Sequence, residues 1–382
     1  MAFEHYIRSG QKMLRCGYTT GTCAALAAAG AARLLLTGQR PALLCLRTPK
    51  GWLVEVEPAA LERAPGLARC AVRKDAGDDA DVTDGMLVWA AVRRIEAPEI
   101  RIDGGEGVGR VTRPGLDQPV GAAAINRVPR RMIAGAVQAE LDAAGAAGGA
   151  EVVVSIPGGA ERARRTFNPL LGIEGGLSVL GTSGVVEPMS EQAIVDTIGV
   201  ELRQAFCACP QGRLILTPGN YGADFLAANG LDALGVPVVR CSNFIGEALD
   251  MAAAEGFSAV LLVGHIGKLV KLAGGIMNTH SRSADCRTEL FCAHAAAAGA
   301  STALCRALLD APTTDACIAL LDTAGLRAAV LDSLTAAAQR HLERRAAGAY
   351  RVGVELFSNE YGPLGASPAA LELIGQWRND RQ

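Results

Sequence analysis

Short alternating hydrophobic segments, typical of strands, dominate the first 148 residues. Residues 42–47 and 52–57 alternate on either side of Pro49-Lys50-Gly51 and predict a β-hairpin. Further strands are predicted at residues 67–73, 86–95 and 99–102. Because short strands joined by turns form antiparallel sheets, we predict an α+β domain for residues 1–148, with a largely antiparallel sheet.

Two helices are expected within this domain. The Ala- and Leu-rich residues 23–36 predict the first helix, with Thr22 as its N-cap and Gly38 at its C-terminal end. A second helix is predicted from about residue 129 to residue 144. The Gly/Ala-rich stretch that follows marks a domain boundary, which we place between residues 148 and 149.

The pattern changes in residues 149–382, where near-continuous apolar runs alternate with helical segments. Strands are predicted at residues 151–156, 214–217, 236–240 and 259–263. Buried strands that alternate with helices predict an α/β domain with a mostly parallel sheet. Ligands of such sheets bind beyond the carboxyl ends of the strands. The small polar loops at residues 181–184, 218–222, 242–243 and 264–268 are therefore expected to line a binding site.

Residues 263–289 are the main candidate for chemistry. The chain has five Lys, thirty-two Arg and five His, and two of the lysines and two of the histidines lie in this stretch. We predict His265, His280 and Asp285 as catalytic residues and Lys268 and Lys271 as ligand-binding cations. An ammonium is a compact charge with a tunable pKa, whereas a guanidinium is not. The alternative is that both lysines form the solvated edge of a helix.

Arginines gather in a Gly- and Pro-rich segment, residues 104–133, that includes Arg110, Arg113 and Arg130. Long ordered loops are usually functional, and guanidinium groups match carboxylates and phosphates. The glycine spacing is not that of a dinucleotide fingerprint. A polyanionic ligand is therefore predicted, with a solvated basic loop as the alternative.

Two further segments carry weaker signals. Thr19, Thr20 and Thr22 precede the first predicted helix and favour an anion site, although plain helix caps share this pattern. The acidic residues 74–85 could bind a hard cation, but their spacing differs from that of a calcium loop. An acidic turn held by Lys74 is the preferred interpretation.

Composition narrows the class of protein. Half of the 382 residues are apolar, a fifth are charged, 4% are aromatic, and the net charge is −2. These values predict a globular protein without a nucleic-acid partner. The Ala-rich runs are too short for a membrane span, and no secretory signal is recognised. Eleven scattered cysteines indicate a cytoplasmic enzyme with reduced thiols, and their spacing predicts no metal site.

Several long sequence blocks resemble one known family. They are CGYTTGTCAALAA (16–28), KDAGDDADVTDG (74–85), GGEGVGRVTRPGL (104–116), AINRVPR (124–130), GTSGVVEPMSE (181–191), GHIGKLVKLAGGIMNTHS (264–281) and ADCRTE (284–289). This set resembles the CbiD family, the cobalt-precorrin-5B C-1 methyltransferases of cobalamin biosynthesis.

The resemblance implies S-adenosylmethionine as methyl donor and a cobalt-bearing, ring-contracted tetrapyrrole as acceptor, methylated at C-1 to give cobalt-precorrin-6A. Cobalt is then only part of the substrate. Positioning does most of the catalysis in methyl transfer. If a proton leaves the corrin, His265 or His280 is the expected base. A CbiD-like fold is expected and not the common Rossmann methyltransferase fold, because Cys241-Ser242-Asn243 lacks the acid that would hold a ribose. A homo-oligomer is possible.

These expectations assign residues to the two ligands. The donor is expected at Gly219, Asn220, Tyr221, Gly222, Ser242, Asn243, Gly264 and Gly267. The carboxylate arms of the tetrapyrrole are expected at Thr19, Thr20, Thr22, Lys74, Arg110, Arg113, Arg130, Thr182, Ser183, Lys268 and Lys271. The alternative functions are a small-molecule kinase, for which no P-loop pattern is present, and a non-catalytic tetrapyrrole carrier.

Overall fold

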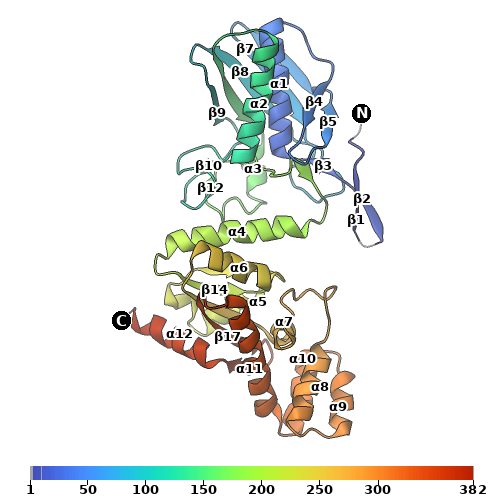
Figure 1. The fold of residues 1–382 in the computed structure, drawn as a ribbon, viewed down its shortest axis with the longest axis vertical. Coiled ribbons are helices and arrows are strands. Elements are labelled where there is room, and N and C mark those ends of the chain that lie inside the picture. The colour runs from blue at the N-terminus through green and yellow to red at the C-terminus, as the bar shows by residue number, and fades with distance from the viewer. Residues whose placement is uncertain (1–2, 10, 382) are drawn as a thin grey trace. The chain divides into compact units, whose positions relative to one another are not determined.

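The computed structural model describes residues 3–9 and 11–381. The chain divides into two compact units, unit 1 (Met1–Glu191) and unit 2 (Gln192–Gln382). Figure 1 colours unit 1 from blue to green and unit 2 from yellow-green to red. Both units combine helices with sheets, which confirms the predicted mixture of α and β structure.

A five-stranded sheet lies at the centre of unit 1, in the order β6-β7-β8-β11-β9. Its strands are β6 (Ala60–Ala64), β7 (Leu67–Arg73), β8 (Leu87–Ile95), β9 (Ile100–Gly104) and β11 (Gly149–Ser155). Neighbouring strands are antiparallel, except that β11 and β9 are parallel. Helices α1 (Thr20–Thr37) and α2 (Arg127–Ala143) share one hydrophobic core with this sheet (Figure 1).

Helix α1 is built for close packing. It is rich in Ala, and a Cβ on Gly30 would lie 2.8 Å from the Cys70 sulfur. By length and composition alone α1 could cross a membrane, but 78% of it is buried inside the protein. Gly38 ends the helix with a φ of 75°, as predicted. The N-cap is Thr19 and not the predicted Thr22, because the Thr19 side chain accepts a hydrogen bond from the Thr22 N–H.

The remaining elements of unit 1 are short. The predicted hairpin is confirmed as β4 (Leu44–Arg47) and β5 (Leu53–Val56). The other pairs are β1 (Tyr6–Ser9) with β2 (Lys12–Arg15), β3 (Gly17–Tyr18) with β13 (Val185–Val186), and β10 (Arg110–Val111) with β12 (Ile173–Glu174). Helix α3 (Gly159–Ala163) lies at the same end of unit 1 as β10 and β12 (Figure 1).

Strand β11 decides where unit 1 ends. The sequence placed a boundary between residues 148 and 149 and assigned residues 151–156 to the parallel sheet of a second domain. Instead, β11 lies between β8 and β9, and the division falls after Glu191. A buried central strand reads as a continuous apolar run in either kind of domain, so its composition does not reveal which sheet it joins.

The sheet of unit 2 has the order β15-β14-β16-β17-β18. Its strands are β14 (Arg213–Thr217), β15 (Val238–Arg240), β16 (Ala259–His265), β17 (Arg351–Ser358) and β18 (Gly362–Ala366). The first four strands in this order run parallel, and β18 is antiparallel to β17. The three strands predicted between residues 214 and 263 are therefore present and parallel.

Helices cover both faces of this sheet (Figure 1). One face packs against α4 (Glu191–Ala208), α6 (Ile245–Glu255) and α11 (Arg327–Ala346), and the other against α5 (Tyr221–Ala228) and α12 (Pro368–Asn379). The remaining helices are η1 (Asp232–Leu234), α7 (Ile266–Leu269), η2 (Val270–Gly274), α8 (Arg287–Ala297), α9 (Thr302–Leu309) and α10 (Thr314–Thr323).

Candidate functional site

The carboxyl ends of the parallel strands bring several predicted site residues together in unit 2. Because β14, β16 and β17 run parallel, the loops that follow them leave the sheet at the same edge. The centroid of the His265 ring, at the end of β16, lies 6.3 Å from that of Tyr221 and 5.7 Å from that of Phe357. Three strand-end segments therefore contribute side chains to one place.

His265 is held by its own loop. It is the N-cap of α7, and its Nδ1 accepts a hydrogen bond from the Gly267 N–H at 3.1 Å. A neutral imidazole whose Nδ1 accepts carries its proton on Nε2. Burial lowers the pKa of His265, and the charge of Asp315 opposes this only in part. The ring is therefore neutral at pH 7, with Nε2–H as a donor.

His280 has the same arrangement, because its Nδ1 accepts a hydrogen bond from the Arg282 N–H at 3.0 Å. Asp285 accepts two hydrogen bonds from Arg287, at 2.7 and 2.9 Å, and this hydrogen bonding lowers its pKa. Within residues 3–9 and 11–381, no hydrogen bond or ion pair connects His280 or Asp285 to His265. The three predicted catalytic residues do not form a connected group.

Lys268 and Lys271 lie close together in the chain but have different environments. Lys271 is buried, and its Nζ donates to the carbonyl oxygens of Thr279 at 3.1 Å and Ala284 at 2.7 Å. Lys268 is half-buried and has no hydrogen bond or ion pair with any described residue. Burial is the main cause that lowers the pKa of Lys268. Lys271 therefore ties together the segment that includes Thr279 and Ala284, whereas the Lys268 ammonium has no protein partner among the described residues.

Glycines allow the backbone to approach Lys268. Gly219 has a φ of +98°, and a Cβ there would lie 3.3 Å from the Lys268 Nζ. At Gly222, a Cβ would lie 2.6 Å from the Thr217 side chain, so α5 begins directly against the end of β14. Asn220, which precedes α5, makes no side-chain cap hydrogen bond. The loop after β14 thus brings the Gly219 backbone close to the Lys268 ammonium, and the next residue, Asn220, is exposed.

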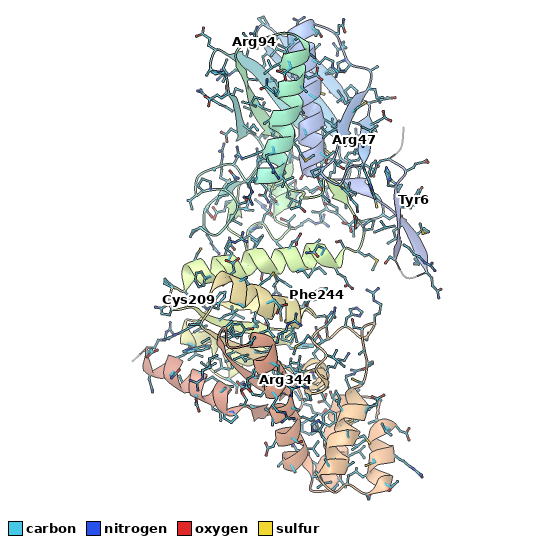
Figure 2. All side chains as sticks on the ribbon, viewed as in Figure 1. Tyr6, Arg47, Arg94, Cys209, Phe244 and Arg344 are labelled. Carbon is cyan, nitrogen blue, oxygen red and sulfur yellow. The ribbon has the colours of Figure 1, made fainter. Side chains whose placement is uncertain are left out.

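The other residues predicted to bind the methyl donor lie in closely packed neighbouring loops. Gly264 lies where a Cβ would be 2.8 Å from Pro218, and Gly267 lies where a Cβ would be 3.2 Å from the His265 Nδ1. Ser242 has a φ of 54°, which is rare for a residue other than glycine. The carbonyl of Asn243 accepts the Thr279 N–H, and its Oδ1 accepts the Thr279 hydroxyl. Asn243 thus ties the loop after β15 to the segment after η2, beside the buried Phe244 (Figure 2).

In unit 1, the predicted threonines lie against the predicted 181–184 loop. The Thr22 hydroxyl donates to the Gly184 carbonyl at 2.6 Å, and the Thr20 hydroxyl donates to the Leu180 carbonyl at 3.3 Å. The N–H of Gly21 also donates to Leu180, and the N–H of Thr19 donates to Gly184. The hydroxyl and N–H groups that were expected to bind an anion therefore donate to carbonyl oxygens of this loop instead. The threonines hold the loop in place. Thr182 and Ser183 lie in that loop, where the Ser183 hydroxyl donates to the Val185 carbonyl.

Lys74 holds the acidic turn, which confirms the preferred interpretation of residues 74–85. Its buried Nζ lies 2.9 Å from the Asp81 Oδ2. Asp84 accepts the Ala76 N–H, and Asp79 accepts the Met189 N–H. The turn is an internal hydrogen-bonded element, and Lys74 has almost no exposed surface for a ligand.

The three predicted arginines of the Gly-rich segment have different roles. Arg110 makes two hydrogen bonds to the Asp103 carboxylate, at 2.6 and 3.0 Å. Arg130 donates to the carbonyls of Ile125 and Ile102, both at 2.8 Å. Arg113 is exposed, and its hydrogen bond to the Leu170 carbonyl is long at 3.4 Å. Arg130 also lies at a shallow cavity of about 410 Å³ between β9 and α2.

Two residues near His265 were not singled out from the sequence. The Ser358 hydroxyl, at the end of β17, donates to the Asp315 Oδ1 at 2.7 Å, and the charge of Asp315 acts on His265. Ser358 could have been found, because a strand parallel to β16 ends there. Asp315 lies in a helical region whose pattern carries no functional signal.

Comparison with known proteins identifies the family. The CbiD family model matches residues 7–188, and the model of the CbiD C-terminal domain matches residues 278–368. A protein of Ruminiclostridium cellulolyticum is 44% identical over 93% of this chain and 92% of its own. A protein of Alkaliphilus metalliredigens is 41% identical over 97% of each chain. Both relatives are named cobalt-precorrin-5B C(1)-methyltransferase.

A solved structure is also similar. It is the cobalamin biosynthesis protein (cbiD) from Archaeoglobus fulgidus, which is 29% identical, with a TM-score of 0.39, over 73% of this chain and 86% of that chain. The family models and the relatives confirm the resemblance seen in the sequence. The chain belongs to the CbiD family.

Proposed function

We propose that this protein is the methyltransferase that methylates ring carbon C-1 of cobalt-precorrin-5B with S-adenosylmethionine, giving cobalt-precorrin-6A in cobalamin biosynthesis. The observation that carries this proposal is the identity of 44% and 41%, over nearly the whole chain, to relatives that bear this name. Cobalt enters as part of the substrate. The methyl carbon moves from sulfur to C-1, and the electron pair of the broken bond stays on sulfur, leaving S-adenosylhomocysteine.

We assign the donor to the strand-end loops of unit 2. The donor carries an α-carboxylate, and Lys268 is a half-buried cation without a protein partner among the described residues. A charge in such a place is stabilised by a ligand of opposite charge. Gly219 and Asn220 lie in the adjacent loop, where the ligand can also meet the backbone. Strand β15 is followed by Cys241-Ser242-Asn243, without a carboxylate for a ribose, so we propose a donor mode unlike that of the common Rossmann methyltransferases.

We assign His265 to positioning. Its Nδ1 is already used by Gly267, so a neutral His265 offers only the Nε2–H, as a donor. A fixed donor can orient a carboxylate or a ring nitrogen of the substrate, and orientation is the main requirement of an in-line transfer. This assignment replaces the proton-acceptor role expected from the sequence. We retain Arg113 as a cation that binds the substrate, and we assign Lys74, Lys271 and Arg130 a structural role.

A labelling experiment tests the function. The purified protein is incubated with enzymatically generated cobalt-precorrin-5B and S-adenosylmethionine carrying a ¹³C methyl group. We expect one ¹³C methyl resonance at C-1 of the product and stoichiometric S-adenosylhomocysteine. Tetrapyrrole binding without label transfer would identify a carrier, and ATP-dependent phosphorylation of a small molecule would identify a kinase.

The proposal also includes a cytoplasmic location and leaves a homo-oligomer possible. All eleven cysteines are free, as expected in a reducing compartment. Helix α1, the one candidate span within the described residues, is accounted for by its burial in the core of unit 1.

A further inference from the structure

We propose that residues 162–170 of unit 1, together with Arg113, form a docking surface for the carboxylate-bearing tetrapyrrole. We call this set the 162–170 surface; it consists of Arg113, Arg162, Arg164, Arg165, Phe167 and Leu170. The inference rests on the proposed function and names a substrate-binding element for it. The sequence pattern gave no reason to select residues 162–170.

The backbone of this segment is ordered by local hydrogen bonds. Helix α3 continues into a turn in which the Thr166 hydroxyl donates to the Ala163 carbonyl at 2.7 Å and accepts the Asn168 N–H at 3.1 Å. Asn168 is buried, donates to the Gly176 carbonyl at 3.3 Å and accepts the Ser178 hydroxyl at 3.2 Å. Ala163 and Asn168 therefore anchor the segment and leave the side chains between and beside them outside.

The outward side chains are arginines and large apolar groups. Arg162, Arg164 and Arg165 are exposed, and none of them makes an ion pair with a residue that the structure describes. Phe167 is 56% exposed and Leu170 is 61% exposed. Binding surfaces are enriched in aromatic residues and Arg. An exposed aromatic residue within five positions of three exposed arginines therefore points to a ligand that is both apolar and anionic.

Arg113 joins this surface from a distant part of the sequence. Its Nη1 lies 3.4 Å from the Leu170 carbonyl. Gly172, with a φ of +67°, has no Cβ, and one placed there would lie 2.6 Å from the Arg113 Cγ. The Arg113 side chain thus lies across the end of the 162–170 segment. Residues 162–170 contain three arginines and no acidic residue, and Arg113 adds a fourth guanidinium group.

A tetrapyrrole matches this chemistry. Its macrocycle offers a flat, largely apolar face to Phe167 and Leu170, and its acetate and propionate arms offer carboxylates to the arginines. Guanidinium groups bind carboxylates in a fork geometry and also stack on flat π-systems. A nucleic acid would share part of this chemistry, but the chain as a whole has a net charge of −2. We therefore assign the surface to the substrate.

Titration with uroporphyrin III, a stable octacarboxylate tetrapyrrole, tests the assignment. The test variant is Arg162→Gln/Arg164→Gln/Arg165→Gln, and the control is Arg69→Gln/Arg93→Gln/Arg101→Gln, which removes the same charge from ion-paired arginines of unit 1. We expect the test variant to bind about tenfold more weakly at low salt and the control to bind like wild type. Phe167→Ser should weaken binding at every salt concentration, because its contribution is apolar.

Steady-state kinetics with cobalt-precorrin-5B give an independent readout. The test variant should raise the KM for the tetrapyrrole about tenfold, with kcat and the KM for S-adenosylmethionine unchanged. If the wild-type protein transfers no methyl group, the proposed function fails. The porphyrin titration still shows whether the 162–170 surface binds a tetrapyrrole.

Two results overturn the inference. One is wild-type porphyrin affinity in both the test variant and Phe167→Ser. The other is tight binding of a single-stranded DNA oligonucleotide at this surface without porphyrin binding. A thermal melt of each variant shows whether it is folded. If a triple variant is not folded, the single substitution Arg164→Gln replaces the test variant and Arg69→Gln replaces the control.

Discussion

The Nδ1 of His265 lies 3.1 Å from the backbone nitrogen of Gly267 and accepts its hydrogen bond. The Nδ1 of His280 accepts the N–H of Arg282 in the same way, at 3.0 Å. In each case the donor lies two residues after the histidine. Both histidines were predicted from the sequence to be bases. Because Nδ1 accepts in each, both carry the proton on Nε2 and act as hydrogen-bond donors there.

Two substitutions at His265 separate its two nitrogens. In His265→Asn, the side-chain oxygen can take the place of Nδ1 and keep the hydrogen bond from Gly267, but the Nε2–H is lost. In His265→Gln, a side-chain N–H can replace Nε2–H, but the cap is lost, at a cost of about 1 kcal/mol. We expect Asn to keep the free energy of unfolding and lose about tenfold or more in kcat/KM, and Gln to show the reverse. Equal losses of activity in two stable variants would instead indicate a proton acceptor.

The pKa of His265 also predicts how stability depends on pH. Burial lowers this pKa in the folded state below its ordinary value of 6.5. Well above pH 6.5 the ring is neutral in both states. As pH falls below 6.5, the unfolded state takes up a proton that the folded state does not, so the free energy of unfolding decreases until the folded-state pKa is passed. Thermal melts from pH 8 to pH 5 should show a smaller decrease for His265→Asn than for wild type; parallel curves would contradict this.

Lys268 and Lys271 should respond to substitution in opposite ways. Lys268→Met removes a half-buried charge that has no partner in the part of the chain that the structure describes. We therefore expect unchanged or higher thermal stability and about tenfold weaker binding of S-adenosylhomocysteine. Lys271→Met leaves the Thr279 and Ala284 carbonyls without their donor, at a cost of about 1–3 kcal/mol. Chemical denaturation and calorimetry measure the two effects. A stable Lys271→Met with weak donor binding would reverse these assignments.

Arg130 and Arg110 are expected to matter for folding and not for the substrate. Arg130→Met removes donors from the Ile102 and Ile125 carbonyls and should lower the free energy of unfolding by about 1–3 kcal/mol. Arg110→Gln breaks an exposed pair with Asp103, which is worth about 0–1 kcal/mol. Porphyrin affinity should stay within about threefold of wild type in both variants. A selective loss of affinity in a stable Arg110→Gln would show that this arginine binds the substrate after all.

Lys74 and Asp81 form a buried pair whose loss should be costly. Lys74→Met leaves a largely buried carboxylate unpaired, which we expect to cost about 3 kcal/mol. Burial raises the pKa of Asp81, but the charge and hydrogen bonds of Lys74 and Thr83 outweigh it and lower the pKa overall. The contribution of this carboxylate to stability is therefore present above its unfolded-state pKa and is lost as pH falls through the folded-state pKa. Acid titration of wild type against Asp81→Asn measures it.

Periodicity predicted most of the elements because it follows from which face of each element is buried. Strand β7 was predicted with the bounds that it has, and the parallel order of β14, β15 and β16 followed from their apolar runs. The sheet that β11 joins was not predictable. Strand pairing depends on tertiary contacts, and the residues of one strand do not show which strands will lie beside it. The N-cap of α1 was misplaced by three residues, because Thr19 and Thr22 are equally good caps by composition.

The candidate site was predictable to the level of loops. Strand ends of a parallel sheet meet at one edge, so the order of strands and loops along the chain was enough to group residues near Gly219 and His265. The sequence could not predict which N–H donors already form hydrogen bonds within the protein. Arg130 and Lys271 look like ligand-binding cations in the sequence, but backbone carbonyls contributed by other segments satisfy them. The exposed Phe167 carried no signal, because exposure is a property of the assembled fold.

The position of β11 has a practical consequence for the design of truncated proteins. A polypeptide that stops at residue 148 keeps β8 and β9 but lacks the strand that joins them, so two long rows of backbone amides and carbonyls would face solvent. Such open edges recruit other chains, and inclusion bodies are the expected product in expression trials. A stop codon placed after Glu191 retains every strand of that sheet and gives the natural first design for producing unit 1 alone.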